Sequence, residues 1–113
     1  MNLRDRILAA RDLGEREVNV PEWGCKLRVR GLTVAESERF EALQGESWAQ
    51  QMAFVAIAGT VDEAGAPVFG PDDVEALTGK SIAALRRVSE AVLALSHSDE
   101  AADGEAGGGA AGN

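Results

Sequence analysis

The stretch EREVNVPEWGCKLRVR, residues 15–30, decides the fold, because both of its halves alternate polar and apolar residues. A period of two is typical of strands that are buried on one face only. Residues 21–24 between the halves have a turn composition, so the sequence predicts a β-hairpin with one apolar face. The expected cross-strand pairs are Val20 with Cys25, Val18 with Leu27, Glu17 with Arg28, Glu15 with Arg30 and Asn19 with Lys26.

Helix signals dominate the sequence after the hairpin. Thr33 and Glu36 have the spacing of a capping box, which opens a helix through about Leu43. Ser47 can cap a second helix over residues 48–58, whose sequence WAQQMAFVAIA is apolar on nearly every side. A helix without a polar face is normally buried, so we expect this helix, its first residue Trp48 included, to form the centre of the domain.

Further elements are predicted between this helix and Ser96. Residues 60–62 and 67–69 flank a turn and predict a second, very short hairpin. Residues 71–77 predict a short helix that begins with a proline. Ser81 can cap a last helix that runs to about Leu95, with one apolar stripe formed by Ile82, Leu85, Val88, Val92 and Leu95.

A weakly apolar helix is expected before the hairpin, over residues 2–13. Asn2 can cap it and Gly14 can end it, and its apolar residues at helical spacing are Leu3, Ile7 and Leu8. Because it carries so few large apolar side chains, we expect this helix to dock loosely or to bind a partner.

The length of 113 residues allows one domain of ordinary size. From His97 onward the sequence HSDEAADGEAGGGAAGN has no large apolar residue, so residues 97–113 are expected to form a flexible, disordered and acidic tail. Residues 1–96 then form a single globular domain. Its expected class is α+β and helix-dominated, with an N-terminal helix and a β-hairpin followed by a small helical bundle.

Charge and hydropathy argue against two kinds of partner. Nineteen Asp and Glu residues outnumber 11 Lys and Arg residues, giving a formal charge of -8, whereas nucleic-acid binding needs clustered cations. No stretch approaches the roughly 20 apolar residues that cross a bilayer, and the charged N-terminus does not resemble a signal peptide. A single cysteine, Cys25, fits a reducing compartment. We expect no nucleic acid, no membrane and a cytosolic location.

Residues that carry catalysis or hold a metal are sparse. His97 is the only histidine and lies at the junction with the predicted tail. Cys25 alternates onto the inner face of the hairpin, where a small buried side chain is expected. The acidic turn 62–65 lacks the further oxygen ligands of a calcium loop, and no glycine-rich phosphate loop follows a strand. We therefore expect no catalytic residue, metal or cofactor, and a protein that is not an enzyme.

The candidate functional residues are those suited to bind another protein. Trp23 lies at the hairpin tip, where it either folds back over the domain's own apolar surface or anchors a partner. Leu3 and Ile7 offer a second apolar contact, to a partner or to another copy of the chain. Arg28 and Arg30 form a small basic edge that could touch an acidic partner, although pairing with the glutamates of the opposite strand also explains them.

Eight fragments follow one another in an order that suggests a family. They are ILAARDL (residues 7–13), VNVPEWG (18–24), LRVRGLT (27–33), ESERFE (36–41), VDEAGAPVF (61–69), DDVEAL (72–77), KSIAALRRV (80–88) and LALS (93–96). The most specific part is PEWG followed by VRGLT and then by the D-x-x-G-x-P-x-F turn. Over residues 3–96 this order resembles the tail assembly chaperones of long-tailed, siphovirus-type bacteriophages and prophages.

The resemblance implies a non-catalytic assembly factor made in the host bacterial cytoplasm and absent from the mature virion. Such chaperones are thought to hold the phage tape measure protein and to recruit the major tail tube protein, so that the tube polymerises around the tape measure. Many are also made in a longer form by translational frameshifting, and the glycine run 107–109 suggests G-rich codons there. The resemblance also leaves open that copies of this chain associate with each other.

Other readings compete with this expectation. A small structural component of the tail or the head–tail connector, retained in the virion, is the main alternative. An acidic mimic of DNA has only the net charge in its favour, since the folded part interleaves Arg with Glu. An enzyme comes last, because the residues for catalysis are missing.

Overall fold

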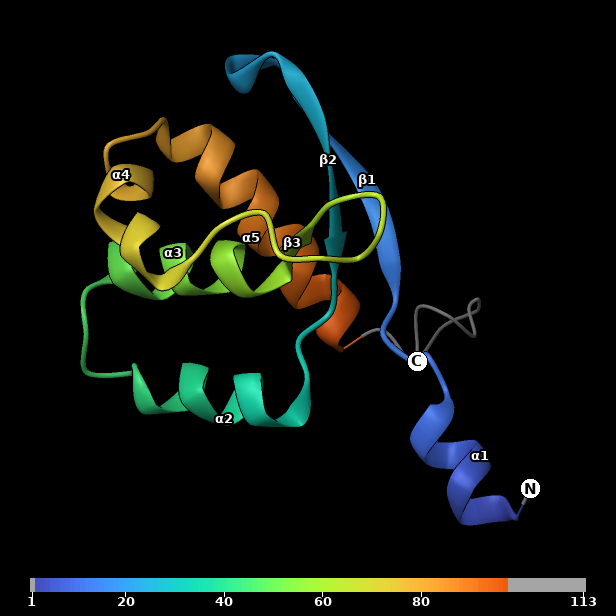
Figure 1. The fold of residues 1–113 in the computed structure, drawn as a ribbon. Coiled ribbons are helices and arrows are strands. Elements are labelled where there is room, and N and C mark those ends of the chain that lie inside the picture. Colours follow the sequence, from blue (N-terminus) through green and yellow to red (C-terminus); the bar gives the residue numbers. More distant parts are fainter. Residues whose placement is uncertain (1, 98–113) are drawn as a thin grey trace, which may run out of the picture.

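The structure is a computed structural model that describes residues 2–97, and its helices dominate a small antiparallel sheet (Figure 1). The α+β, helix-dominated class expected from the sequence is confirmed. Apart from His97, the predicted tail lies outside the described residues. The elements are α1 (Leu3–Ala9), β1 (Glu15–Val20), β2 (Cys25–Arg30), α2 (Val34–Ala42), α3 (Trp48–Gly59), β3 (Thr60–Val61), α4 (Val74–Thr78) and α5 (Ile82–Ser96).

The hairpin forms with the register that the alternation predicts, and all five expected pairs are present. A 3-10 turn, Pro21–Trp23, joins β1 to β2, and Gly24 closes it with a φ of 69° that suits glycine. The short strand β3 adds to the other edge of β2, giving the strand order β1-β2-β3. The second hairpin is smaller than expected, because β3 meets the returning chain in a single bridge between Val61 and Pro67.

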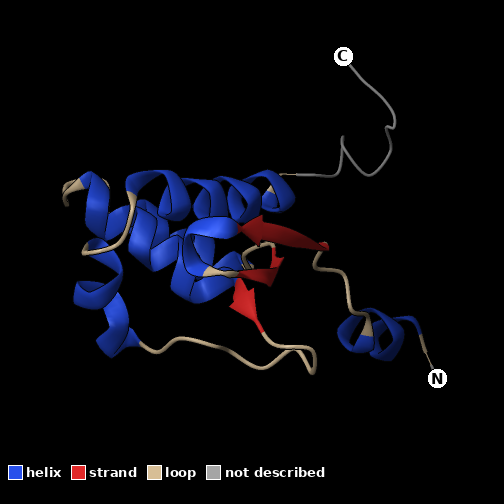
Figure 2. Cartoon of the chain, turned by 90° about the horizontal axis from the view of Figure 1, so that it is seen from above, coloured by secondary structure: helices blue, strands red, loops and turns tan. Residues whose placement is uncertain are grey.

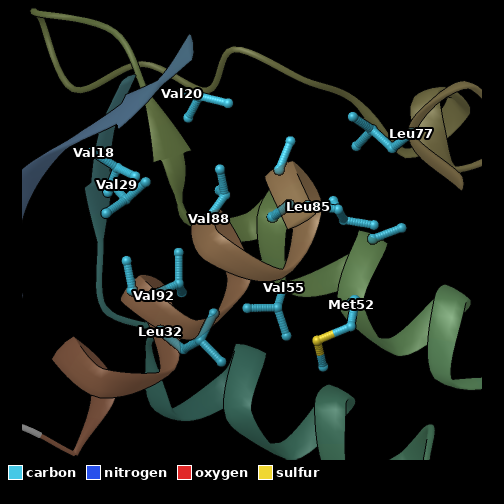
Figure 3. Packing of buried hydrophobic residues seen from close by; sticks show 14 residues of the cluster. Val18, Val20, Val29, Leu32, Met52, Val55, Leu77, Leu85, Val88 and Val92 are labelled. Carbon is cyan, nitrogen blue, oxygen red and sulfur yellow. The ribbon is translucent and has the colours of Figure 1, made fainter. Parts of the chain in front are cut away.

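The core lies between the sheet and the two longest helices, α3 and α5, which pack against each other (Figure 3). As expected for an apolar helix, α3 is central and buries Met52, Ala53, Val55, Ala56 and Gly59. The sheet contributes three buried valines, which are Val18, Val20 and Val29. From α5 the buried large side chains are Leu85, Val88 and Val92.

Three residues expected in the core are exposed instead, each at the start of an element. Trp48 is the first residue of α3 and is 44% exposed, with the Arg86 guanidinium 5.4 Å from the centroid of its ring. Ile82 opens α5 and is 63% exposed. Cys25 opens β2, where the hairpin tip projects past the helices (Figure 1), and its thiol is free and exposed. Periodicity in the sequence predicts which face of an element a residue lies on. It does not predict whether a neighbouring element extends far enough to cover that residue.

The caps read from the sequence are present. Asn2, Ser47 and Ser81 each accept a hydrogen bond from a backbone N–H of the first turn. Thr33 and Glu36 form both halves of the capping box. Helix α1 is the exception in length, because it ends at Ala9 rather than near Leu13. It buries none of its residues, so no packing sustains a longer helix.

Candidate protein-interaction surfaces

Helix α1 presents an apolar face that its own chain does not cover. Leu3, Ile7 and Leu8 are 67%, 61% and 67% exposed, respectively. Figures 1 and 2 both show α1 set apart from the body, to which residues 10–14 connect it. The structure therefore leaves Leu3 and Ile7 available for an intermolecular contact, which is the role predicted for them.

Trp23 is half-buried and packs against the core cluster at the hairpin tip. Next to it, Glu22 and Arg87 form a two-bond ion pair of 2.7 and 3.2 Å that ties the tip to α5. This hydrogen bond from Arg87 lowers the pKa of Glu22. The structure thus shows the inward-folded arrangement of Trp23, and only part of its ring is left for a partner.

The two arginines of the predicted basic edge are both paired, but not as the register suggested. The Arg28 guanidinium lies 3.4 Å from Glu15, diagonally across the strands, and Glu17 does not take part. Arg30 lies opposite Glu15 but donates its two carboxylate hydrogen bonds, of 2.8 and 3.0 Å, to Glu36 of α2. The correction has a simple cause, since Glu36 offers a bidentate and partly buried partner that strand alternation cannot reveal.

This pair changes the acidity of both partners. Hydrogen bonding to Glu36 raises the pKa of Arg30, and the same contact lowers the pKa of Glu36, with the backbone N–H of Thr33 adding to the effect. The charged Glu36 carboxylate therefore has two roles. It accepts hydrogen bonds from Arg30, and one of its oxygens also accepts the capping hydrogen bond from the backbone N–H of Thr33. Arg30 is therefore a structural link between β2 and α2 and is not free to bind an acidic partner.

An apolar groove of about 530 Å³ lies between α2, α3 and the segment that leads into α4. Its floor is the α3 side chains Phe54, Ile57 and Ala58, all half-buried. The remaining lining residues are Arg30, Glu36 and Arg39 on one side, and Pro67, Phe69, Pro71 and Val74 on the other. With its aromatic, aliphatic and proline side chains and a few charged ones, this groove has the composition of a site for another protein chain.

Chemically reactive side chains are not gathered in the described part of the chain. Within residues 2–97, no three His, Cys, Asp or Glu side chains come close enough together to hold a metal ion. His97, at the end of α5, is exposed. Over the same residues, no helix combines the length and the apolar character needed to cross a membrane.

Comparison with known proteins identifies the architecture. No protein family model matches the chain, and no curated protein sequence does. The solved structure of the bacteriophage HK97 tail assembly chaperone matches with a TM-score of 0.63 at 20% sequence identity, over 81% of this chain and 95% of that one. The chain has the tail assembly chaperone fold.

On this tail assembly chaperone fold, sequence reasoning found one open surface and missed another. The exposed face of α1 followed from helical spacing, whereas the groove combines residues far apart in sequence. The sequence held one sign of the groove. Helix α3 is apolar on nearly every side, and its neighbours in the fold do not cover all of these sides. The likeness of fold also agrees with the family resemblance of residues 3–96, which rested on short fragments alone.

Proposed function

We propose that the chain is a phage tail assembly chaperone that binds the tape measure protein without catalysis and recruits tail tube subunits during tail morphogenesis. The observation that carries the proposal is the match of its fold to 95% of the HK97 tail assembly chaperone. The ordered resemblance of its sequence fragments to the same family is a second, separate support.

The physical properties of the chain suit such a role. A chaperone of an aggregation-prone partner needs accessible apolar surface, and α1 together with the α3 groove supplies it. It also needs repulsive charge that keeps the complex in solution, and the formal net charge of -8 supplies that. We place its action in the host bacterial cytoplasm, with the mature virion lacking it.

The test is coexpression with the tape measure protein and the major tail tube protein encoded in the same phage genome. We expect the tape measure protein to remain soluble and to copurify with the chain, and to be found in the pellet when the chain is omitted. The tube protein is expected to join the purified complex only when both other proteins are present. A tape measure protein that is equally insoluble with and without the chain contradicts the proposal.

Purified virions separate the proposal from its main alternative, a structural tail or head–tail connector component. Mass spectrometry is expected to detect tape measure and tube proteins but not this chain, whereas stoichiometric amounts of the chain in the particle would favour the structural role. Sequencing the gene tests the longer frameshifted form, which requires an open overlapping frame downstream of the codons for residues 107–109.

A further inference from the structure

Helix α3 carries apolar side chains on nearly every side, but the neighbouring elements cover only some of these sides. Helices α4 and α5 pack against one part of it, and α2 makes a smaller contact elsewhere. The half-buried residues in the second half of α3 are Phe54, Ile57 and Ala58, which are spaced i, i+3 and i+4. This spacing places the three in one stripe along α3, so the apolar surface that they leave open is continuous.

The wall across from α2 extends this apolar stripe. Phe69 and Val74 are half-buried and line the same groove, together with the exposed rings of Pro67 and Pro71. An apolar recess beside a helix, lined by an apolar stripe on one side and by further apolar side chains on the other, fits the apolar face of an amphipathic helix.

The charge at the edge of the groove indicates what such a helix should carry. Of the three charged lining residues, Arg30 and Glu36 neutralise each other in their bidentate pair. Arg39 is exposed, and no hydrogen bond or ion pair engages it within residues 2–97. The lining therefore has one uncompensated positive charge on a chain whose overall charge is strongly negative.

We propose that this groove binds an amphipathic helix of a partner protein, with the apolar face on Phe54 and Ile57 and a carboxylate beside Arg39. This inference rests on the proposed chaperone function and names the site and the chemistry of the bound segment. Complementary charge at the edge of an apolar contact sets the specificity and orientation of such a helix.

A second copy of the chain is a poorer match for the groove. Its unpartnered helix is α1, whose apolar side chains are accompanied by Arg4 and Arg6 against the single acid Asp5. That segment is positively charged on balance, so its docking would bring cations toward Arg39. A carboxylate placed beside Arg39 is instead attracted by that guanidinium, although the net charge of the whole chain is negative.

The experiment uses two labelled synthetic peptides of about 20 residues with the same leucine stripe, long enough to be helical when bound. One has glutamates beside the stripe and the other has lysines at those positions. Fluorescence anisotropy with the full chain is done at about 0.15 M salt, where the net negative charge of the chain is largely screened from the peptide. It is expected to show at least about threefold tighter binding of the glutamate peptide, because the glutamate-to-lysine change replaces an attraction to exposed Arg39 by a repulsion. Equal binding, or no binding of either peptide, overturns the inference.

Two variants test the residues. Arg39→Glu is expected to reverse the preference, so that the lysine peptide binds more tightly, and Ile57→Gln to weaken both peptides at least about tenfold. Arg16→Glu, an exposed charge reversal on β1, is the matched control and should leave the preference unchanged. Circular dichroism melting checks that each variant is folded. An unaltered preference in folded Arg39→Glu contradicts the assignment.

The coexpression assay separates this inference from the proposed function. If the wild-type chain keeps the tape measure protein soluble and folded Ile57→Gln does so equally well, the groove assignment fails while the chaperone function stands. The opposite result is that the wild-type chain binds the glutamate peptide more tightly but does not keep the tape measure protein soluble. In that case the chaperone function fails, and the groove binds a helix of another partner.

Discussion

At the scale of single residues, Trp23 combines useful packing with an unsatisfied polar atom. Its ring packs on the core, but its indole N–H is buried with no hydrogen-bond acceptor among the described residues. A buried donor without a partner costs about 1–3 kcal/mol. We therefore expect Trp23→Phe to be as stable as the wild type or more stable, because a phenyl ring still packs on the core while the unpaired N–H is removed, which offsets the smaller ring. Urea unfolding measures the difference.

Trp23→Ala provides the contrast for that measurement. Loss of a half-buried ring should lower the free energy of unfolding by about 1–3 kcal/mol, less than the 3–5 kcal/mol that is typical of a fully buried one. If Trp23→Ala leaves the stability unchanged, the ring serves only intermolecular contact, as an exposed anchor would.

Gly59 lies where α3 passes close to α5 and β2. A Cβ built there would clash with both Cγ atoms of Val92 and would lie 2.9 Å from the Arg30 carbonyl oxygen. Gly59→Ala should therefore force α3 away from α5 and β2 and lower the free energy of unfolding by about 1–3 kcal/mol. Gly45→Ala is the matched control, since nothing lies within 4 Å of its Cβ. Equal midpoints in chemical denaturation would contradict this close packing.

At the scale of elements, α2 is attached to the sheet chiefly through the Arg30–Glu36 pair, because none of its residues is fully buried. Glu36→Gln keeps an acceptor for the cap but removes the charge, and it should cost about 1–2 kcal/mol at neutral pH. Glu38→Gln, on the exposed side of the same helix, should cost less than about 0.5 kcal/mol.

The pH dependence of that cost follows from the direction of the pKa shift. The hydrogen bonds from Arg30 lower the pKa of Glu36 below its ordinary value of 4.5. The stabilisation is then complete above pH 4.5 and is lost as the pH falls through the lowered pKa. Unfolding of wild type and Glu36→Gln at a series of pH values should converge in acid. A gap that is constant with pH would exclude an ionic origin.

Helix α1 is expected to be the least protected helix of the described chain. It has 7 residues and buries none of them, so neither its length nor its packing stabilises it. Hydrogen exchange of a dilute sample should show α1 amides close to the unprotected rate, while those of α3 and α5 exchange much more slowly. Protection of α1 equal to that of α3 in the dilute chain would mean that α1 docks on its own body.

The elements show where sequence reasoning succeeds and where it ends. Hairpin register and helix caps depend on residues a few positions apart, so alternation and capping rules found them. The partner of Arg30 depends on where α2 lies relative to β2, and the exposure of Trp48 depends on how far the neighbouring elements extend over the start of α3. Those are properties of tertiary packing, which local patterns do not contain.

At the scale of the whole molecule, the core closes within the described residues, between the sheet, α3, α4 and α5. We therefore expect a chain that ends at His97 to unfold at the same midpoint as the full chain. The shortened chain loses four acidic residues, so it should be less soluble at high concentration. Light scattering and thermal melting measure the two effects separately. A lower melting temperature would show that residues 98–113 contribute to the fold.

The fold class and the central place of α3 were predictable because they follow from composition and from long periodic segments. The groove was not, since Phe54, Phe69 and Val74 come from three separate segments. Only the excess of apolar residues on α3 hinted that something must cover it. The fold class therefore follows from patterns within single segments, whereas the groove depends on contacts between segments that are far apart in the sequence.

The unequal exposure of the two tryptophans makes the chain its own optical reporter. The sequence has no tyrosine, so its ultraviolet fluorescence comes from Trp23 and Trp48 alone. Trp48 is open to solvent beneath Arg86, whereas Trp23 is half-sheltered at the tip of the hairpin. Acrylamide should quench the first emission more strongly than the second. With one indole replaced by a phenyl ring, the spectrum of the other would tell whether an arriving chain has touched the hairpin tip or the start of α3, without any attached dye.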